Sequence, residues 1–168
     1  IELRPVFACN VPEAGFDMRT GLVATADNRI VLESGVDLAR IQKSPMYGSS
    51  KNDFSHLPGT YTSIWGLFAH NHGHWMIECL LRLFAVQAGC CPGAKLLMPR
   101  DLSPVQNESF LACLPDNTEV IYLPRESRVR VDQFIFLSPP TGGTSCYFSP
   151  AVHLEYARHC IFAHFDLT

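Results

Sequence analysis

The stretch TYTSIWGLFAHNHGHWMIECLLRLFAVQAG, residues 60–89, decides the fold of this chain. Its first part, Thr60–Ala69, is rich in β-branched and aromatic residues and predicts a buried strand. Its second part, Trp75–Ala88, is filled with strong helix formers and is followed by Gly89, which predicts a buried helix with a defined end. A strand that leads directly into a helix is the first half of the unit from which parallel sheets are built.

The same alternation continues downstream. Lys95–Met98 predicts a short strand, and Ser103-Pro104 predicts the start of a helix that runs to about Cys113, because Ser caps helices and Pro fits their first turn. Further strands are predicted at Glu119–Leu123 and Val129–Leu137. The order strand, helix, strand, helix, strand predicts an α/β fold, a Rossmann-like three-layer lobe with a parallel central sheet.

Weaker signals flank this region. Thr20–Ser34 predicts a hairpin whose turn lies at Asp27-Asn28, residue types that accept a positive φ. Gln42–Pro58 is rich in Ser, Gly, Lys, Asn and Pro and predicts a long surface loop. Ser149-Pro150 predicts the start of a last helix that ends near His164. The hairpin region therefore precedes the α/β lobe, and one further helix follows it.

Composition excludes some classes of function. The chain has 168 residues, of which 47% are hydrophobic and 17% charged, so it can bury a core. Its net charge of −3 argues against nucleic acid as the main partner, since phosphate binding needs a clustered basic surface. Arg125, Arg128 and Arg130 stand close together, but Glu126 and Asp132 dilute them. We expect this cluster to be a solvated loop.

No part of the sequence predicts a membrane span or a disulfide framework. A membrane helix needs roughly 18 uninterrupted apolar residues. Even the most hydrophobic stretch, residues 75–91, contains Glu78, Arg82 and Gln87. The seven cysteines are odd in number and lack CxxC spacing, and no apolar leader resembling a signal peptide opens the sequence. These features predict reduced thiols and a cytoplasmic protein.

Four polar residues stand three, four and four positions apart in the decisive stretch: Asn71, His74, Glu78 and Arg82. On a helix they share one stripe. Burying charged groups is costly unless they are paired, so the stripe indicates either a structural ion pair or a site. In the structural alternative Glu78 pairs with Arg82, and His74 caps the first turn. In the functional alternative Glu78 holds the His74 imidazole as a base, while Arg82 faces an anionic or hydroxyl-rich ligand.

A metal site is a competing interpretation of the same segment. Gly66, His72, His74 and Glu78 fit the spacing G-x5-H-x-H-x3-E of the first cupin motif, with His70 as an extra possible ligand. That motif belongs on β-strands, whereas the residues from Trp75 onward predict a helix. The second cupin motif, P-x-G-x2-H, is also absent from the sequence.

The segment Asn71–Leu83, NHGHWMIECLLRL, resembles the N-x-x-H-W-x-x-[D/E]-x-L-P-R-L signature of family-61 glycosyltransferases. The resemblance continues through Gln106 and Glu108 and through the strands EVIYLP and VRVDQFIF, and it covers roughly residues 21–137. The chain departs from the signature in having His72-Gly73 between the Asn and the His and Leu81 before the Arg.

This resemblance implies a GT-B architecture, in which two Rossmann-like lobes face each other across a cleft. Residues 1–147 would be the N-terminal, acceptor-side lobe, and residues 148–168 would form the helix leading to a C-terminal lobe that this chain lacks. The sequence begins at Ile1 rather than Met, which fits a piece of a longer protein. We therefore expect the isolated chain to be inactive.

The resemblance also implies the chemistry. A sugar would pass from a nucleotide-sugar donor to a hydroxyl of a glycan, lipid or protein acceptor with inversion, without a cofactor or metal. His74 would be the base and Glu78 its orienting partner. Asn71, His72 and Arg82 would contact substrate or support that contact. The alternative is a non-catalytic carbohydrate-binding or scaffold lobe. A bacterial parent would be cytoplasmic, and a eukaryotic one would lie in the Golgi or endoplasmic reticulum lumen.

Overall fold

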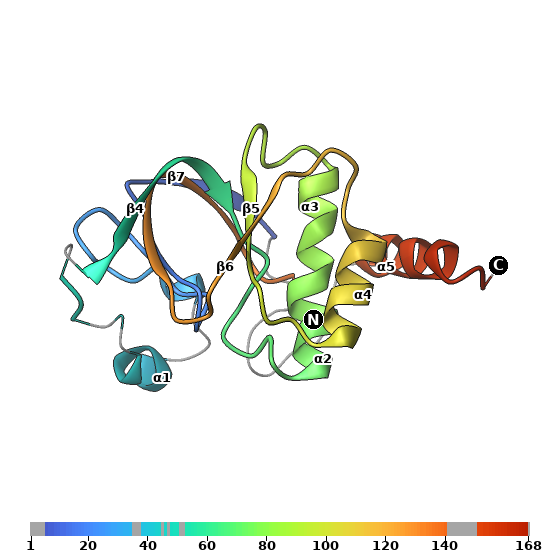
Figure 1. Cartoon of the computed structure of the whole chain (residues 1–168), viewed down its shortest axis with the longest axis horizontal. Coiled ribbons are helices and arrows are strands. Elements are labelled where there is room, and N and C mark those ends of the chain that lie inside the picture. Colours follow the sequence, from blue (N-terminus) through green and yellow to red (C-terminus); the bar gives the residue numbers. More distant parts are fainter. Residues whose placement is uncertain are drawn as a thin grey trace.

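The structure is a computed structural model that describes residues 6–34, 38–44, 46, 48–50, 53–140 and 151–167. Within these residues, seven strands form one mixed sheet, and the helices α3, α4 and α5 gather on one side of it (Figure 1). The strands are β1 Ala8–Pro12, β2 Gly15–Asp17, β3 Val23–Ala24, β4 Ser55–Thr62, β5 Lys95–Pro99, β6 Val120–Leu123 and β7 Arg128–Leu137. The helices are α1 Leu38–Lys43, α2 His72–His74, α3 Leu83–Gln87, α4 Pro104–Cys113 and α5 Ala151–His164.

Four neighbouring strands of the sheet are parallel, in the order β6-β5-β4-β7. Two helical crossovers connect β4 to β5 and β5 to β6, as the alternation in the sequence predicts. On the other edge of β7, β1 and β2 pair with it in antiparallel orientation, and β3 pairs with β2. The prediction of an α/β fold with parallel pairing is confirmed.

The sheet is only partly parallel, and residues 124–127 join β6 to β7 without a helix. Helices that pack on the sheet are seen on one side in Figure 1. The three-layer Rossmann-like lobe therefore stays a prediction. No helix among the described residues is long and apolar enough to cross a membrane.

Strand β4 begins earlier than predicted and ends earlier. It runs along β7 from the pair Ser55 and Val129 to the pair Thr62 and Ile135, so part of the predicted loop 42–58 is strand. A register shift between Leu57 and Thr60 accommodates Pro58 and Gly59. The predicted strand 60–69 stops at Thr62, because the Ser63 hydroxyl accepts a hydrogen bond from the Trp65 amide and redirects the backbone.

The hairpin predicted in residues 20–34 is present in a short form. Ala24 and Ile30 form its bridge, and Asn28 adopts a φ of 62° in the turn, the conformation that Asn tolerates better than most residues. The predicted loop 42–58 also contains the end of α1, whose Ile41 packs in a small apolar cluster with Leu22 and Met46.

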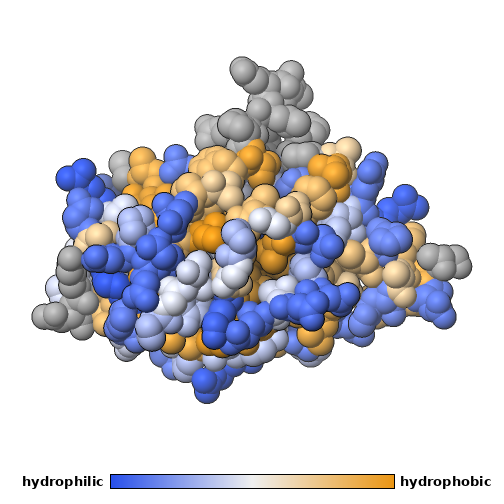
Figure 2. Space-filling view, turned by 90° about the horizontal axis from the view of Figure 1, so that it is seen from above, coloured by the Kyte–Doolittle hydropathy of each residue, from blue (hydrophilic) through white to orange (hydrophobic). Residues whose placement is uncertain are grey.

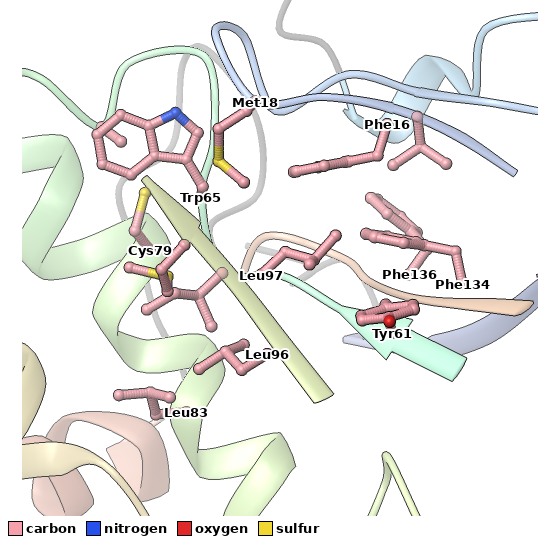
Figure 3. Packing of buried hydrophobic residues seen from close by; sticks show 14 of the residues in the cluster. Phe16, Met18, Tyr61, Trp65, Cys79, Leu83, Leu96, Leu97, Phe134 and Phe136 are labelled. Atoms are coloured by element: carbon pink, nitrogen blue, oxygen red, sulfur yellow. The ribbon is translucent and has the colours of Figure 1, made fainter. Parts of the chain in front are cut away.

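The main core lies between the sheet and the helix His72–Gln87. Figure 3 shows Leu96 and Leu97 of β5 between the helix residues Cys79 and Leu83 and the aromatic rings of the neighbouring strands. The core continues on the side of β5 away from the helix, where Phe16 and Phe134 stack with ring centroids 5.0 Å apart (Figure 3). Other apolar residues remain at the surface, where Figure 2 shows them gathered in the middle of the upper face between hydrophilic flanks.

Helix α4 forms as predicted. Ser103 accepts a hydrogen bond from the Gln106 amide, and the Gln106 side chain accepts one from the Ser103 amide. This reciprocal cap satisfies two donors that a helix start leaves without partners. Helix α5 also forms, whereas Ser149-Pro150, predicted to begin it, lies outside the described residues.

Candidate active site

The predicted site begins at the turn between β4 and the long helix. The Asn71 side chain accepts hydrogen bonds from the amides of Gly73 at 2.9 Å and His74 at 3.4 Å. It is therefore the N-cap of the helix, which fixes where the first turn starts. The amide of Trp75 follows with a backbone bond to the Asn71 carbonyl at 2.8 Å. Asn71 thus sets the position of the residues behind it.

The helix that carries the site is not uniform. Trp75–Cys79 forms a widened π-helical turn, and Leu80–Arg82 forms a tight 3-10 turn before ordinary α-helix resumes at Leu83. Wide turns of this kind are rare and occur frequently at functional sites. A wide turn rotates less per residue than an α-helix and a 3-10 turn rotates more, so the backbone between Trp75 and Arg82 departs locally from uniform helical spacing.

His74 and Glu78 form a close pair within this helix. The distance from His74 Nδ1 to Glu78 Oε1 is 2.9 Å, and their side chains are 23% and 18% exposed. The His74 ring also packs on the Phe68 ring, with centroids 4.8 Å apart. The imidazole is therefore held on one side by a carboxylate and on another by an aromatic face.

Arg82 contacts the loop that follows β4. Its side chain is buried, with 7% of the residue exposed, and its Nη1 donates hydrogen bonds to the carbonyls of Ile64 at 3.1 Å and Trp65 at 3.5 Å. Burial lowers the pKa of Arg82, and the nearby Cys79 and Glu78 partly offset this effect. Glu78 is thus paired with His74 and also lies near enough to Arg82 to act on its pKa, while no salt bridge between Glu78 and Arg82 is seen among the described residues. Arg82 holds the loop that leaves β4.

Two further contacts bring neighbouring loops to the same edge of the sheet. Arg125, in the connection after β6, donates from Nε to the Asp101 carboxylate at 2.8 Å. Its guanidinium also lies 4.8 Å from the centroid of the Trp65 ring. Residues that follow β4, β5 and β6 therefore meet at the carboxyl ends of the parallel strands, the edge at which open α/β sheets bind ligands.

Sequence reasoning missed Trp65, Asp101 and Arg125 as neighbours of the site. Arg125 was grouped with Arg128 and Arg130, but those two lie on β7 and contact other partners. The signal that could have found the three residues is their position, each within a few residues of the end of a predicted parallel strand. The arginines do not form one basic surface.

The cupin interpretation is wrong in its structural requirement. His72 and His74 lie on a helix, where the motif needs strands. In the part of the chain that the structure describes, no three His, Cys, Asp or Glu side chains are grouped so that they could hold a metal ion. His72 is exposed in the first helical turn, and His70 is exposed just before it.

A cavity of about 280 Å³ lies away from these residues. It is lined by residues of β1, β4 and β7 and by Cys90, and its polar side chains include Asn10 and Gln133. Neither His74 nor Glu78 lines it. The cavity and the His74–Glu78 pair are therefore separate features of the molecule.

Comparison of the chain with models of known protein families, with curated proteins and with solved structures gave no match.

Proposed function

We propose that this chain is the acceptor-side lobe of an inverting glycosyltransferase, the kind of enzyme that its helix signature resembles. His74 is the base for the acceptor hydroxyl, and Glu78 is its orienting partner. The observation that carries the proposal is the 2.9 Å contact between His74 Nδ1 and Glu78 Oε1 at the carboxyl edge of a partly parallel sheet. Such a contact favours a proton on Nδ1, and the basic nitrogen is then Nε2.

The chemistry follows from this tautomer. The acceptor hydroxyl oxygen forms a bond to the anomeric carbon of the donor sugar as the bond to the nucleoside diphosphate breaks. His74 Nε2 takes the hydroxyl proton, and the Glu78 carboxylate stabilises the imidazolium that results. A single displacement of this kind inverts the configuration of the anomeric carbon. The departing diphosphate needs positive charge or hydrogen-bond donors, which we assign mainly to a second lobe.

The fold supports the same assignment. The order β6-β5-β4-β7, with helical crossovers between β4, β5 and β6, is the arrangement expected at the centre of a Rossmann-like lobe. In such sheets ligands lie outside the carboxyl ends of the strands, where Asn71 and His74 are found. In this proposal Asn71 fixes the helix start and His72, exposed beside it, contacts the acceptor.

Arg82 favours a second candidate, a non-catalytic carbohydrate-binding lobe. Its guanidinium donates hydrogen bonds to the Ile64 and Trp65 carbonyls. The positive charge that was expected to contact a ligand therefore stabilises the loop after β4. In the catalytic proposal Arg82 acts by positioning the loop after β4. The two candidates differ in whether His74 is needed for turnover or only for binding.

The deciding experiment uses the longer protein that contains this segment. Release of nucleoside diphosphate from a panel of nucleotide-sugars is measured with and without glycan acceptors, for the wild type and for His74→Ala. His70→Ala serves as the matched control, because His70 is exposed and lies just outside the helix. Transfer that is lost in His74→Ala, with acceptor binding retained, supports the enzyme. Binding without transfer in the wild type supports the binding lobe.

A further inference from the structure

Two cysteines approach each other where α4 and α5 pack together. Cys113 is the last residue of α4 and is 1% exposed. Its Sγ lies 3.9 Å from the Ala157 carbonyl of α5, and the Tyr156 hydroxyl donates a 2.6 Å hydrogen bond to the Cys113 carbonyl. Cys160 stands three residues beyond Ala157, nearly one helical turn, and therefore lies on the same face of α5.

Cys160 packs against the same apolar cluster that contains Cys113 and Ala157. Burial raises the pKa of Cys113 to about 12, and the nearby Cys160 thiol contributes to that rise. Cys160 is partly exposed, so of the two thiols it is the one that reagents in solution reach first. All described cysteines are reduced in the structure.

We infer that Cys113 and Cys160 form a redox-sensitive pair that is oxidised to a disulfide linking the end of α4 to α5. The assignment rests on the convergence of the two helices at Tyr156 and Ala157, and it is independent of the proposed transferase activity. Cys79 and Cys91 are also buried, but they lie on the helix and loop that precede β5. Cys90 is exposed and lines the cavity described above.

The oxidant is a low-molecular-weight disulfide, for which oxidised glutathione is the probe. The Cys160 thiolate attacks one glutathione sulfur, which forms a mixed disulfide and releases a first glutathione thiolate. The Cys113 thiol loses its proton, which its raised pKa makes the slow step, and the resulting thiolate attacks Sγ of Cys160 to form the protein disulfide and release a second glutathione thiolate. The two cysteine protons end on the two glutathione molecules, so one disulfide is reduced while one is formed.

The disulfide would also stabilise the helix that carries the candidate site, because α5 packs against that helix. On α5, His153 Nδ1 lies 3.1 Å from the Leu81 carbonyl, and the His153 ring packs 4.7 Å from the Phe84 ring. Leu81 and Phe84 belong to the helix that carries His74 and Glu78. Fixing α5 to α4 therefore braces the back of that helix.

The test equilibrates the purified chain in buffers of oxidised and reduced glutathione, traps free thiols and maps the cysteine-containing peptides by mass spectrometry. We expect a peptide that links Cys113 to Cys160 in the wild type and in Cys90→Ser, the matched exposed-cysteine control. We expect none in Cys160→Ser. The melting temperature should rise by about 5–10 °C on oxidation of the first two proteins and remain unchanged in the third.

Several results would overturn the inference. One is glutathione retained on Cys160 without a link to Cys113, and another is a link to any other cysteine, Cys146 included. Because a disulfide requires Cα atoms about 4.4–6.8 Å apart, absence of the link under oxidising conditions contradicts the predicted approach of the two helices. A link that forms without a rise in melting temperature would remove the bracing role.

Discussion

Gln106 on α4 donates a 2.6 Å hydrogen bond from Nε2 to the carbonyl of Ala69, in the turn just before the helix of the candidate site. The same side chain accepts a hydrogen bond from the Ser103 amide through Oε1. One buried amide therefore both completes the cap of α4 and clamps the turn that precedes Asn71. The position of the His74–Glu78 pair depends on this link between two crossover helices.

Gln106→Ala should lower the free energy of unfolding by about 2–3 kcal/mol, because it removes half of a helix cap and leaves the Ala69 carbonyl without its partner. Urea denaturation measures this change. Glu108→Ala is the control, since Glu108 is exposed on the same helix and its loss should change the free energy of unfolding by less than about 0.5 kcal/mol. Equal effects of the two substitutions would contradict the clamp.

Trp75 and Trp65 give a matched pair of buried indoles. Trp75 Nε1 donates to Ser109 Oγ at 2.9 Å, whereas Trp65 Nε1 is buried and has no hydrogen-bond partner among the residues that the structure describes. Trp75→Phe loses that hydrogen bond as well as volume and leaves Ser109 less satisfied. It should therefore destabilise the chain by about 1 kcal/mol more than Trp65→Phe, as measured by urea denaturation. The reverse order would show that the Trp75 indole bond contributes little.

In the two-lobed transferase proposed above, His74→Ala should lower kcat by about 10²-fold to 10⁴-fold and leave donor affinity largely unchanged, because the base acts in the transition state. A melting curve must accompany the kinetics, since loss of a partly buried side chain can reduce the folded fraction. Full activity in a folded His74→Ala protein would remove His74 from the mechanism.

Glu78→Gln keeps the shape of the side chain and removes its charge, so it should reduce kcat through the same imidazole. The double variant His74→Ala/Glu78→Gln should then lose less activity than the two single effects combined. The measurement is a double-mutant cycle on kcat. Effects on kcat that multiply independently would mean that the 2.9 Å contact is not used in the reaction.

We expect the Asp132 carboxylate to stabilise the fold above its pKa and to lose this contribution as the pH falls. Its pKa lies below the usual 3.8, because the Gly59 amide and the His56 ring bind the ionised carboxylate. A pKa depressed by folding contributes stability that is present above the unfolded value and is lost as the pH falls through the folded value. Unfolding free energy measured between about pH 6 and pH 2 should therefore decline less steeply in Asp132→Asn than in the wild type.

Asp116→Asn is the control for this comparison, since Asp116 is an exposed aspartate in the turn after α4. Its pH profile should parallel that of the wild type. The effect at Asp132 will be small because its side chain is 52% exposed and solvent screens the interaction. Identical profiles for all three proteins would show that the bonds from Gly59 and His56 do not persist in solution.

Local signals in the sequence predicted much of this fold. The cap of α4 at Ser103, the strands β5 to β7 and the turn at Asn28 each depend on a few adjacent residues, and each is found in the structure. The start of β4 at Ser55 was missed because it is set by pairing with β7, more than 70 positions away. Pro58 and Gly59 argue locally against a strand, and long-range pairing overrides them.

The candidate site, like the fold, was predicted only in part. Spacing alone placed His74 and Glu78 on one face, which is where they lie. It also placed Arg82 there, whereas hydrogen bonds to the carbonyls of Ile64 and Trp65 hold that side chain against the loop after β4. The composition of the helix gives no sign of the change from α-helical to wider and tighter turns. Contacts between loops, such as Arg125 with Asp101, require the topology to be known.

The widened turn at residues 75–79 has a consequence for substitutions in this helix. In a wide turn a backbone amide reaches the carbonyl five residues back, as the Leu80 amide does to the Trp75 carbonyl. A change that converted this turn to regular α-helix would shift the backbone hydrogen bonds by one residue. It would therefore redirect the side chains that follow Cys79, Arg82 included.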